Sequence, residues 1–407
     1  MSIRGTLVRW LGGEVRSEIT TSRGLERMLA REGMSSAGVT VTATTASGLP
    51  AVEASVKVIS ESLAQLPLRV MRVDGDRRAP ATDHWAYELL RRRPNPEQTA
   101  FEFREIMTRD YLYRGDGWAL KVMSGQRVID LLRLHPDRIQ VEQNAGRVRY
   151  LYSRPDGSQI EIARDRLFHL RGASEDGITG INPIRQHQNA IGRALALEGH
   201  AGRYFSNGAK PGGLLTQEAG TEMGEDARKA LREDFQEMYS GSNAYKTAVL
   251  PAGMDFKPVS ISNKDAEFIE SAKFSITDIA RIFRVPPHMI GDLERSTFSN
   301  IEHQALEYVK YTLMPHMVRW EQAVERDLLN YDPTLQVKHN ANALLRGDMQ
   351  SRAEALQIQR RNGVISADEW RRLEDMDPRG DRAGEQYIVE QNMIPDDMLG
   401  QTNGGAQ

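Results

Sequence analysis

Apolar residues recur every three or four positions over much of the chain, and shorter stretches alternate between apolar and polar residues. Val52, Val56 and Ile59 follow the first pattern, which predicts an amphipathic helix that begins near Pro50 and ends at Pro67. The alternating residues that come next predict a strand. Asp and Gly residues follow this strand and predict a turn.

The segment up to about residue 171 predicts two further helices and then a run of strands. A short helix over 84–93 is stopped by prolines, and Thr99 with Glu102 forms a capping box that starts the next helix. A glycine-rich break at 115–117 ends that helix. The stretch after it is typical of a meander of strands separated by turn residues. These strands are expected at 118–123, 128–134, 138–141, 148–152, 159–162 and 167–170.

The second half of the chain is predicted to be mainly helical. Pro183 opens a helix over 182–206. Pro315 should kink a long helix over 299–330, because proline removes one backbone hydrogen bond. The other expected elements are a charged helix at 225–239, a strand–turn–strand unit at 241–262, a helix at 264–285 that two prolines end, and a helix at 368–376 that a second capping box opens.

The length of 407 residues exceeds one ordinary core and predicts two or three modules. Apolar residues make up 40% of the chain and charged residues 27%, which is typical of a globular protein rather than a disordered one. The formal net charge is −3, whereas a protein that grips duplex DNA through its phosphates carries a strong basic excess. Tight DNA binding is therefore disfavoured, while passage of DNA through weak contacts is compatible with this charge.

The chain contains no cysteine, which excludes disulfide bonds, thiolate metal sites and a cysteine nucleophile. It has no run of about 18 apolar residues, so we expect no membrane-spanning helix. The N-terminal stretch carries charges among its apolar residues and does not resemble a secretion signal. Residues 1–48 are rich in Gly, Ser, Thr and Arg and predict a mobile arm with one short helix.

No set of residues has the spacing of a catalytic, nucleotide-binding or metal site. The segments Gly172–Gly177 and Gly208–Gly213 match neither a phosphate-binding loop nor a dinucleotide fingerprint. The nine histidines are scattered, and His303 with its acidic neighbours is a weak metal signal. The G-x-S-x-G motif of serine hydrolases is absent. We therefore predict no enzyme, no cofactor and no metal site.

One stretch carries most of the functional information. A helix that ends at Val285, Pro286 and Pro287 is followed by a short polar loop and by a second long helix from Ser299. This unit resembles the portal proteins of tailed bacteriophages, in their compact form. Further blocks similar to that family lie in the same order along the chain. The similar blocks are Pro50–Ala54, Val58–Val70, Arg92–Thr99, Gly177–Ile184, Phe205–Gly213, Phe283–Gly291 and Asn342–Asp348.

The resemblance implies an α+β portal fold with a wing, an α-helical stem, a small β-containing clip and a helical crown. It also implies a ring of identical copies, usually twelve. The implied parts are a flexible arm at 1–48, the wing at 49–220, a first stem helix at 221–240, the clip at 241–263, a second stem helix at 264–285, a tunnel loop at 286–298, a long wing helix at 299–339, the crown at 340–394 and a disordered tail at 395–407.

Three sets of residues are implied to carry function. The DNA-facing tunnel loop comprises Leu293, Glu294, Arg295, Ser296, Thr297 and Phe298. The stem wall of the channel comprises Arg228, Lys229, Arg232, Glu233, Asp234 and Glu237, whose slight acidic excess would repel phosphate and keep DNA contact weak. The clip surface for docking comprises Tyr245, Lys246, Pro251, Met254 and Phe256.

The resemblance further implies a virion protein at one capsid vertex, assembled in the host cytoplasm. The implied partners are further copies of the chain, double-stranded DNA bound weakly and without sequence preference, the large terminase subunit, the head–tail adaptor and the major capsid protein, with no membrane. The sequence leaves open whether the parent is a phage, a prophage or a gene transfer agent. Two other interpretations also stay open: another head–tail connector or adaptor, and a nuclease with dispersed site residues.

Overall fold

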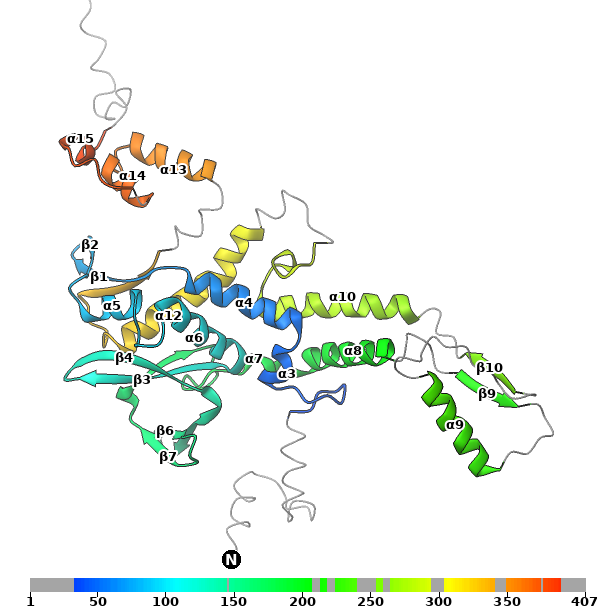
Figure 1. Cartoon of the computed structure of the whole chain (residues 1–407). Coiled ribbons are helices and arrows are strands. Elements are labelled where there is room, and N and C mark those ends of the chain that lie inside the picture. The colour runs from blue at the N-terminus through cyan, green and yellow to red at the C-terminus, as the bar shows by residue number, and fades with distance from the viewer. Residues whose placement is uncertain are drawn as a thin grey trace, which may run out of the picture. The chain divides into compact units, whose positions relative to one another are not determined.

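The structure is a computed structural model that describes residues 33–144, 146–206, 213–217, 224–239, 254–258, 264–293, 304–340, 349–374 and 376–388. The chain divides into two units, 1–339 and 340–407, which we describe separately. The first unit mixes helices with antiparallel sheets, and the described part of the second contains three helices (Figure 1). The predicted α+β class is therefore confirmed.

The first unit contains helices and strands that alternate along the chain. Its helices are α3 (Ala43–Ser47), α4 (Pro50–Ala64), α5 (Trp85–Arg91), α6 (Ala100–Arg114), α7 (Pro183–Gln186), α8 (Gln188–Ser206), α9 (Glu225–Tyr239), α10 (Lys264–Phe283) and α12 (Met314–Asp327). Its strands are β1 (Leu68–Asp74), β2 (Arg77–Pro80), β3 (Asp116–Ser124), β4 (Arg127–Leu134), β5 (Ile139–Asn144), β6 (Arg147–Ser153), β7 (Gln159–Ile162), β8 (Leu167–Arg171), β9 (Gly213–Gln217), β10 (Met254–Pro258) and β11 (Leu335–His339).

The six strands predicted between 118 and 170 are all present, but they do not form one meander. They divide into two three-stranded sheets, with strand orders β4-β3-β8 and β5-β6-β7. β8 returns to pair with β3, with Trp118 opposite His169. The two sheets share a core around Trp118, Tyr150 and Leu167, so burial of these side chains joins them. Local alternation predicts strands but does not predict which strand pairs with which.

The predicted capping box at the start of α6 is confirmed. The Thr99 N–H donates to Glu102 Oε2 at 2.7 Å, and the Glu102 N–H donates to Thr99 Oγ1 at 3.3 Å. The helix ends at Gly115, whose φ of 94° lies in the left-handed region. A Cβ at this position would lie 2.6 Å from the carbonyl oxygen of Gly180. Glycine is therefore required by both the backbone conformation and the close approach of the 180 segment.

The long helix contains a π-helical segment, Tyr308–Leu313, immediately before Pro315. The Met314 N–H donates to the Val309 carbonyl, five residues back. In an α-helix the ring of Pro315 would clash with the carbonyl four residues before it, and the wider π register relieves that clash. The predicted disturbance at Pro315 is therefore present, and it takes the form of a widened turn.

The long helix was predicted over 299–330 and ends close to that bound, but the implied wing-helix part at 299–339 also includes a strand. The helix α12 ends at Asp327, and Leu335–His339 form strand β11, which pairs antiparallel with β1. The sheet order is β11-β1-β2, and neither β2 nor β11 was predicted. The alternating burial of β11 is the signal that the analysis missed.

Carboxylates on α12 accept hydrogen bonds from backbone N–H groups of two different sheets. Glu325 Oε1 accepts from the Val337 N–H at 2.9 Å, and Glu321 Oε1 accepts from the His339 N–H at 2.9 Å, both on β11. Asp327 Oδ2 accepts from the His169 N–H on β8 at 2.8 Å. These bonds fix the helix against both sheets, because hydrogen bonds to ionised acceptors are stronger than neutral ones.

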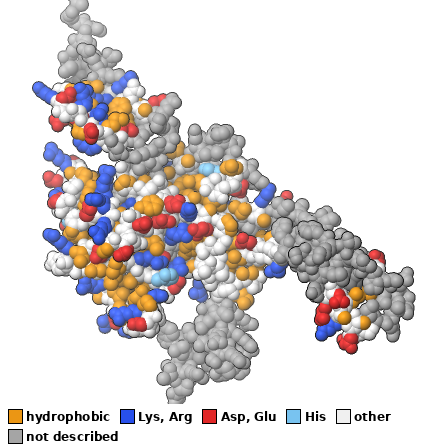
Figure 2. Space-filling view, in the orientation of Figure 1, with side chains coloured by type: hydrophobic (Ala, Val, Ile, Leu, Met, Phe, Trp, Pro, Cys, Tyr) orange, Lys and Arg blue, Asp and Glu red, His pale blue; other side chains and the backbone are white. Residues whose placement is uncertain are grey.

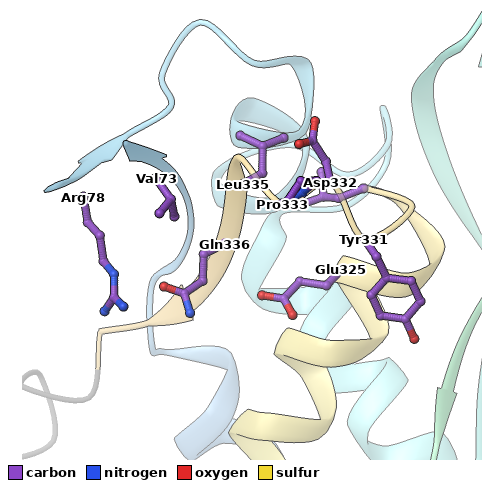
Figure 3. Close-up of a pocket in the computed structure, with 9 residues that line it drawn as sticks. Val73, Arg78, Glu325, Tyr331, Asp332, Pro333, Leu335 and Gln336 are labelled. Carbon is purple, nitrogen blue, oxygen red and sulfur yellow. The ribbon is translucent and has the colours of Figure 1, made fainter. Parts of the chain in front are cut away.

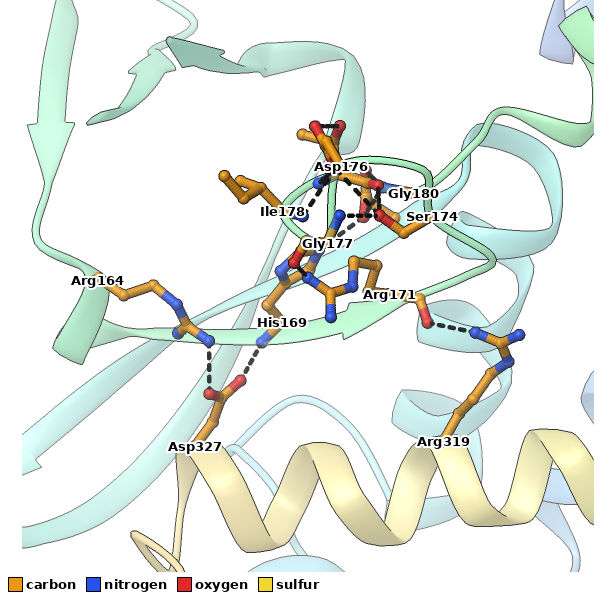
Figure 4. Close-up of polar contacts among 12 residues, drawn as sticks. Arg164, His169, Arg171, Ser174, Asp176, Gly177, Ile178, Gly180, Arg319 and Asp327 are labelled. Carbon is orange, nitrogen blue, oxygen red and sulfur yellow. Dashed lines mark hydrogen bonds and ion pairs between the residues drawn. The ribbon is translucent and has the colours of Figure 1, made fainter. Parts of the chain in front are cut away.

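Asp327 is a buried carboxylate that pairs with several cations, and Figure 4 shows its contacts with Arg164 and His169. Its Oδ1 accepts from the Arg164 guanidinium at 2.6 Å and from Arg326 Nε at 2.8 Å, while Lys121 Nζ donates to its carbonyl at 2.6 Å. Burial alone would raise the pKa of Asp327, but the hydrogen bond from Arg326 and the two guanidinium charges lower it overall. The carboxylate is therefore ionised and fully paired.

Two other predictions need correction. Residues 33–48 were expected in a mobile arm, but Ser35 and Val41 are buried, and a Cβ at Gly192 would lie 2.2 Å from Ser35 Oγ. The helix predicted over 182–206 is interrupted at His187, which separates α7 from α8. By contrast, the charged helix over 225–239 has the predicted bounds.

The second unit contains α13 (Met349–Arg361), α14 (Ala367–Leu373) and α15 (Arg382–Glu385). The predicted capping box is confirmed, because the Ser366 N–H donates to Glu369 Oε2 at 2.8 Å and the Glu369 N–H donates to Ser366 Oγ at 3.1 Å. Asp368 accepts from the Arg379 N–H at 2.7 Å and thereby holds the chain that follows α14.

We expect Asp327→Asn to lower the free energy of unfolding by about 2 kcal/mol, because it leaves the half-buried Arg164 and Arg326 guanidinium groups without their anion. Urea unfolding followed by tryptophan fluorescence measures this loss. Glu175→Gln is the matched control, because Glu175 is an exposed carboxylate, and we expect a change within about 0.5 kcal/mol. Equal stabilities of the two variants would contradict the role given to the network.

The same carboxylate predicts a pH dependence. The pKa of Asp327 is lower in the folded protein than in the unfolded chain, so its stabilisation is present at neutral pH and is lost as the pH falls through the folded value. The difference in unfolding free energy between the wild type and Asp327→Asn should therefore narrow as the pH is lowered from about 5 to about 3. A difference that stays constant over this range would contradict the assigned direction.

Candidate functional site: the joint between α10 and the long helix

The segment singled out in the sequence forms a joint between two helices. The helix α10 ends with the Val285 N–H donating to the Ala280 carbonyl at 2.9 Å and the Arg284 N–H donating to the Arg281 carbonyl at 3.2 Å. This pair of bonds is a Schellman motif. Arg284 has a φ of 55°, a left-handed conformation that glycine normally occupies at this place.

Thr312 on the π-helical segment connects this cap to the long helix. Its buried hydroxyl Oγ1 donates to the Arg284 carbonyl at 2.6 Å. The carbonyl at the end of α10 is thus satisfied by a side chain from the second helix, 28 residues further along the chain. The contact fixes the end of α10 relative to the long helix.

The two prolines lead into a short 3₁₀ helix, Pro287–Ile290, that directs the chain away from α10. Gly291 follows with a φ of 91°, and the Asp292 N–H donates to the Pro287 carbonyl at 3.0 Å. Leu293, the last described residue before the loop, is 64% exposed. The apolar side chain of Leu293 is therefore accessible to another molecule.

A hydrogen bond holds the two ends of the loop together. His288 Nδ1 and Gln304 Oε1 are 2.8 Å apart, and the imidazole donates because the amide oxygen only accepts. This bond joins the residues before and after the segment 294–303. The loop therefore starts and ends at a defined place on the protein.

The long helix is held on its other side by α6. Tyr111 Oη and His316 Nδ1 are 2.5 Å apart in a buried contact, and Trp320 Nε1 donates to Thr108 Oγ1 at 3.1 Å. Burial, together with the charges of Arg319 and Arg284, lowers the pKa of His316 to about 4. The imidazole is therefore neutral at neutral pH and serves as a hydrogen-bond partner rather than a charge.

The helix that lies beside α10 is α8 (Figure 1). The Arg193 guanidinium of α8 lies 3.2 Å from Asp278 of α10, which also pairs with Arg281 at 2.8 Å. The sequence interpretation named α9 as the first stem helix and did not identify α8 as the partner of α10. The periodicity of the 182–206 segment predicts a helix but does not identify the helix against which it packs.

Only some of the predicted site residues lie within the described residues. Of the predicted tunnel-loop residues, Leu293 is described, whereas Glu294, Arg295, Ser296, Thr297 and Phe298 lie outside the described residues. Arg228, Lys229, Arg232, Glu233 and Asp234 are exposed on α9, and Glu237 is on the same helix. Met254 and Phe256 lie on β10, where they pair with Gln217 and Leu215 of β9. Tyr245, Lys246 and Pro251 lie outside the described residues.

The structure also brings together polar residues that the sequence analysis missed. Asp116 Oδ1 lies 2.6 Å from His169 Nε2 and accepts from the Gly180 N–H at 2.9 Å. The loop beyond it is shaped by Asp176, which accepts from the N–H groups of Ile178 and Thr179 at 2.7 and 2.8 Å (Figure 4). These bonds hold the segment that leads into α7 and α8, so the network positions the helix pair.

A shallow cavity of about 290 Å³ lies at the C-terminal end of α12, beside β1 and β11 (Figure 3). Tyr331, one of its lining residues, has a φ angle of 56°. The polar lining side chains of the cavity include Arg78, Glu325 and Asp332. The carboxylate of Glu325 accepts a hydrogen bond from the Val337 N–H and so serves the packing of α12 against β11.

The surface charges are mixed. Figure 2 shows Lys and Arg side chains interspersed with Asp and Glu on the visible face, without one continuous basic surface. Among the described residues, no three His, Cys, Asp or Glu side chains are grouped to hold a metal ion. None of the described helices is long and apolar enough to cross a membrane.

Comparisons with known proteins define the class. The family model described as phage portal protein matches residues 50–375. The portal protein of Enterobacteria phage HK97 is 34% identical over 330 residues, which cover 79% of this chain and 77% of that protein. The probable portal protein of Streptomyces phage phiC31 is 31% identical over 380 residues, which cover 88% and 81%. The chain therefore belongs to the phage portal protein family.

Solved structures agree on the fold. A chain from the neck of an empty gene transfer agent particle, computed with C6 symmetry, superposes with a TM-score of 0.56 at 23% identity, covering 92% of this chain and 99% of that one. An HK97-family phage portal protein from Corynebacterium diphtheriae superposes with a TM-score of 0.55 at 18% identity, covering 74% and 96%. The fold that joins α8, α10 and the long helix is thus a portal fold.

We expect Arg284→Gly to raise the free energy of unfolding by about 0.5–1 kcal/mol, because glycine adopts the left-handed conformation without a Cβ clash. Urea unfolding measures the gain. Arg284→Ala is the matched control, because it also removes the exposed guanidinium but keeps the Cβ, and it should give no gain. A similar effect of both substitutions would show that the side chain, rather than backbone strain, determines stability here.

Proposed function

We propose that copies of this chain form a ring at one vertex of a virus-like capsid and that the ring is the channel through which DNA is packaged and ejected. The observation that carries the proposal is the match of the portal family model to residues 50–375. A ring follows when one surface of each copy binds a different surface of the next and the rotation closes. The relatives that share the fold include chains from particle necks computed with C12 and C6 symmetry.

The stem of this ring consists of α8 and α10 in this proposal, rather than α9 and α10. The support is the contact between these two helices and the Arg193–Asp278 ion pair. The segment between them, which includes β9, α9 and β10, then forms the clip that docks the large terminase subunit and later the head–tail adaptor. The antiparallel pairing of β9 with β10 supports this grouping, because it joins the two ends of that segment.

The loop that begins at Leu293 is the tunnel loop of the channel in this proposal. Its support is the joint described above, in which Thr312 and the His288–Gln304 bond fix both ends of the loop. The remainder of the first unit is the wing, and residues 340–394 are the crown. The protein is structural rather than enzymatic and resides in the virion, where its wing contacts the major capsid protein.

Contact with DNA is weak in this proposal. The formal net charge of −3 provides no excess of cations to release counterions from phosphate. The exposed acidic residues of α9, Glu233 and Asp234, would repel a duplex that came close. A channel that must let DNA slide is better served by such weak contacts than by tight binding.

The test of the proposed function is native mass spectrometry of the purified full chain, with negative-stain imaging of the same sample. We expect rings of about twelve copies with an axial hole. If the chain alone stays monomeric, the measurement is repeated after co-expression with the major capsid protein of the same particle. A monomer under both conditions would contradict the proposal and favour an adaptor protein.

Deletion of Glu294–Thr297 tests the tunnel loop. We expect ring assembly to be unchanged, because the joint that fixes both loop ends is retained, and we expect fewer DNA-containing particles. Particle fractions are counted by electron microscopy, and DNA content is measured by nuclease protection. The matched control is deletion of residues 404–407 at the C-terminus. Normal yields of full particles from the loop deletion would contradict the role of this loop.

A further inference from the structure

The long helix is apolar on two faces, and only one of them is covered within the described part of the first unit. The buried face carries Tyr308, Leu313, Met317 and Trp320. The other face carries Leu306, Tyr311, Met314 and Val318, which are 56%, 56%, 49% and 40% exposed. An exposed row of large apolar side chains on a helix is typical of a surface that binds a partner.

The π-helical segment aligns these exposed side chains. Leu306 and Tyr311 are five residues apart, which is the repeat of a π-helix. Tyr311, Met314 and Val318 then follow at spacings of three and four, the repeat of an α-helix. The four side chains therefore form one stripe, which we call the helix stripe, and the widened turn before Pro315 keeps the stripe continuous.

A second apolar patch lies on another side of the same unit. Ile129 and Leu132 on β4 are 51% and 41% exposed. The sheet order is β4-β3-β8, and α12 packs against β8. The strand β4 is thus the sheet edge remote from the long helix, about 10 Å across the sheet from β8. We call Ile129 and Leu132 the strand patch.

We propose that the helix stripe of one copy binds the strand patch of the next copy in the ring. The inference rests on the proposed ring. A closed ring needs two different complementary surfaces on each copy, and these two patches lie on different elements at different sides of the sheet. The rims are also complementary in charge, because Glu307 and Lys310 flank the helix stripe, while Arg127 and Asp130 flank the strand patch.

Tyr311 is the expected centre of this contact. It lies in the middle of the stripe, and the Lys310 ammonium lies 5.2 Å from the centroid of its ring. Tyrosine is among the residues that most often dominate binding energy at the centre of an interface. Burial of its exposed half against a neighbouring copy would remove apolar surface from water without any change in the folded subunit.

The first experiment compares Tyr311→Glu with Tyr331→Glu in the full chain. Both tyrosines are exposed, at 56% and 66%, and the substitution is the same. We expect Tyr311→Glu to raise the concentration at half assembly by at least about tenfold, because it places a charge at the centre of the contact. Tyr331→Glu should change it by less than about twofold, and circular dichroism should show both variants folded.

The outcomes separate this inference from the proposed function. Rings from the wild type together with folded, unassembled Tyr311→Glu support the inference. Rings from both proteins at the same concentration overturn the inference and leave the proposed ring intact. Failure of the wild type to form rings, alone or with capsid protein, overturns both.

A second experiment locates the partner surface independently of any loss of assembly. A photoreactive benzoyl-phenylalanine replaces Tyr311 in the wild-type background, and rings are formed from a mixture of light and heavy isotope-labelled copies. Mass spectrometry should find cross-links between light and heavy chains that map to the β4 region around Ile129 and Leu132. Cross-links confined to single chains, or mapping between two long helices, would overturn the proposed pairing.

Discussion

The first unit depends on the carboxylates of one helix, α12, that satisfy outward-facing backbone N–H groups of two separate sheets. Glu321 and Glu325 do this for β11, and Asp327 does it for β8. An uncovered strand edge would leave donors unpaired and open to association with other chains. Asp327 stands at the C-terminal end of its helix, where the helix dipole disfavours an anion, so the cations of Arg164 and Arg326 are required to hold it there.

The long helix, of which α12 is the C-terminal part, also fixes the end of α10, because it contains the π-helical turn Tyr308–Leu313 directly before α12. This turn removes the clash that Pro315 would otherwise cause, and it also directs Thr312 toward the Arg284 carbonyl at the end of α10. One local irregularity therefore connects the end of α10 to the long helix. A regular α-helix would rotate each side chain after position 308 by a fraction of a turn, which would separate the hydroxyl from its acceptor.

The sequence predicted elements well where the signal was local. The charged helix over 225–239 and both capping boxes depend on residues within a few positions of one another, and the structure has them as predicted. Long-range pairing was not predictable in the same way. Three contacts join residues far apart in the chain: β8 with β3, β11 with β1, and α8 with α10. A pattern of apolar positions indicates that a face is buried, but it does not identify the element that covers the face. Of the candidate site, the joint was found from its two prolines, whereas Asp116, His169 and Asp327 have no motif around them.

The contacts that fix the joint between α10 and the long helix are made by residues outside the segment 294–303. His288 and Gln304 are 16 residues apart and bond directly to each other, so the entropy of bringing these two residues together is lost on folding. The Schellman cap of α10 and the Thr312 bond lie outside residues 294–303 and do not require any particular side chain there. The packing of α10 against the long helix therefore does not depend on which residues make the proposed contact with DNA.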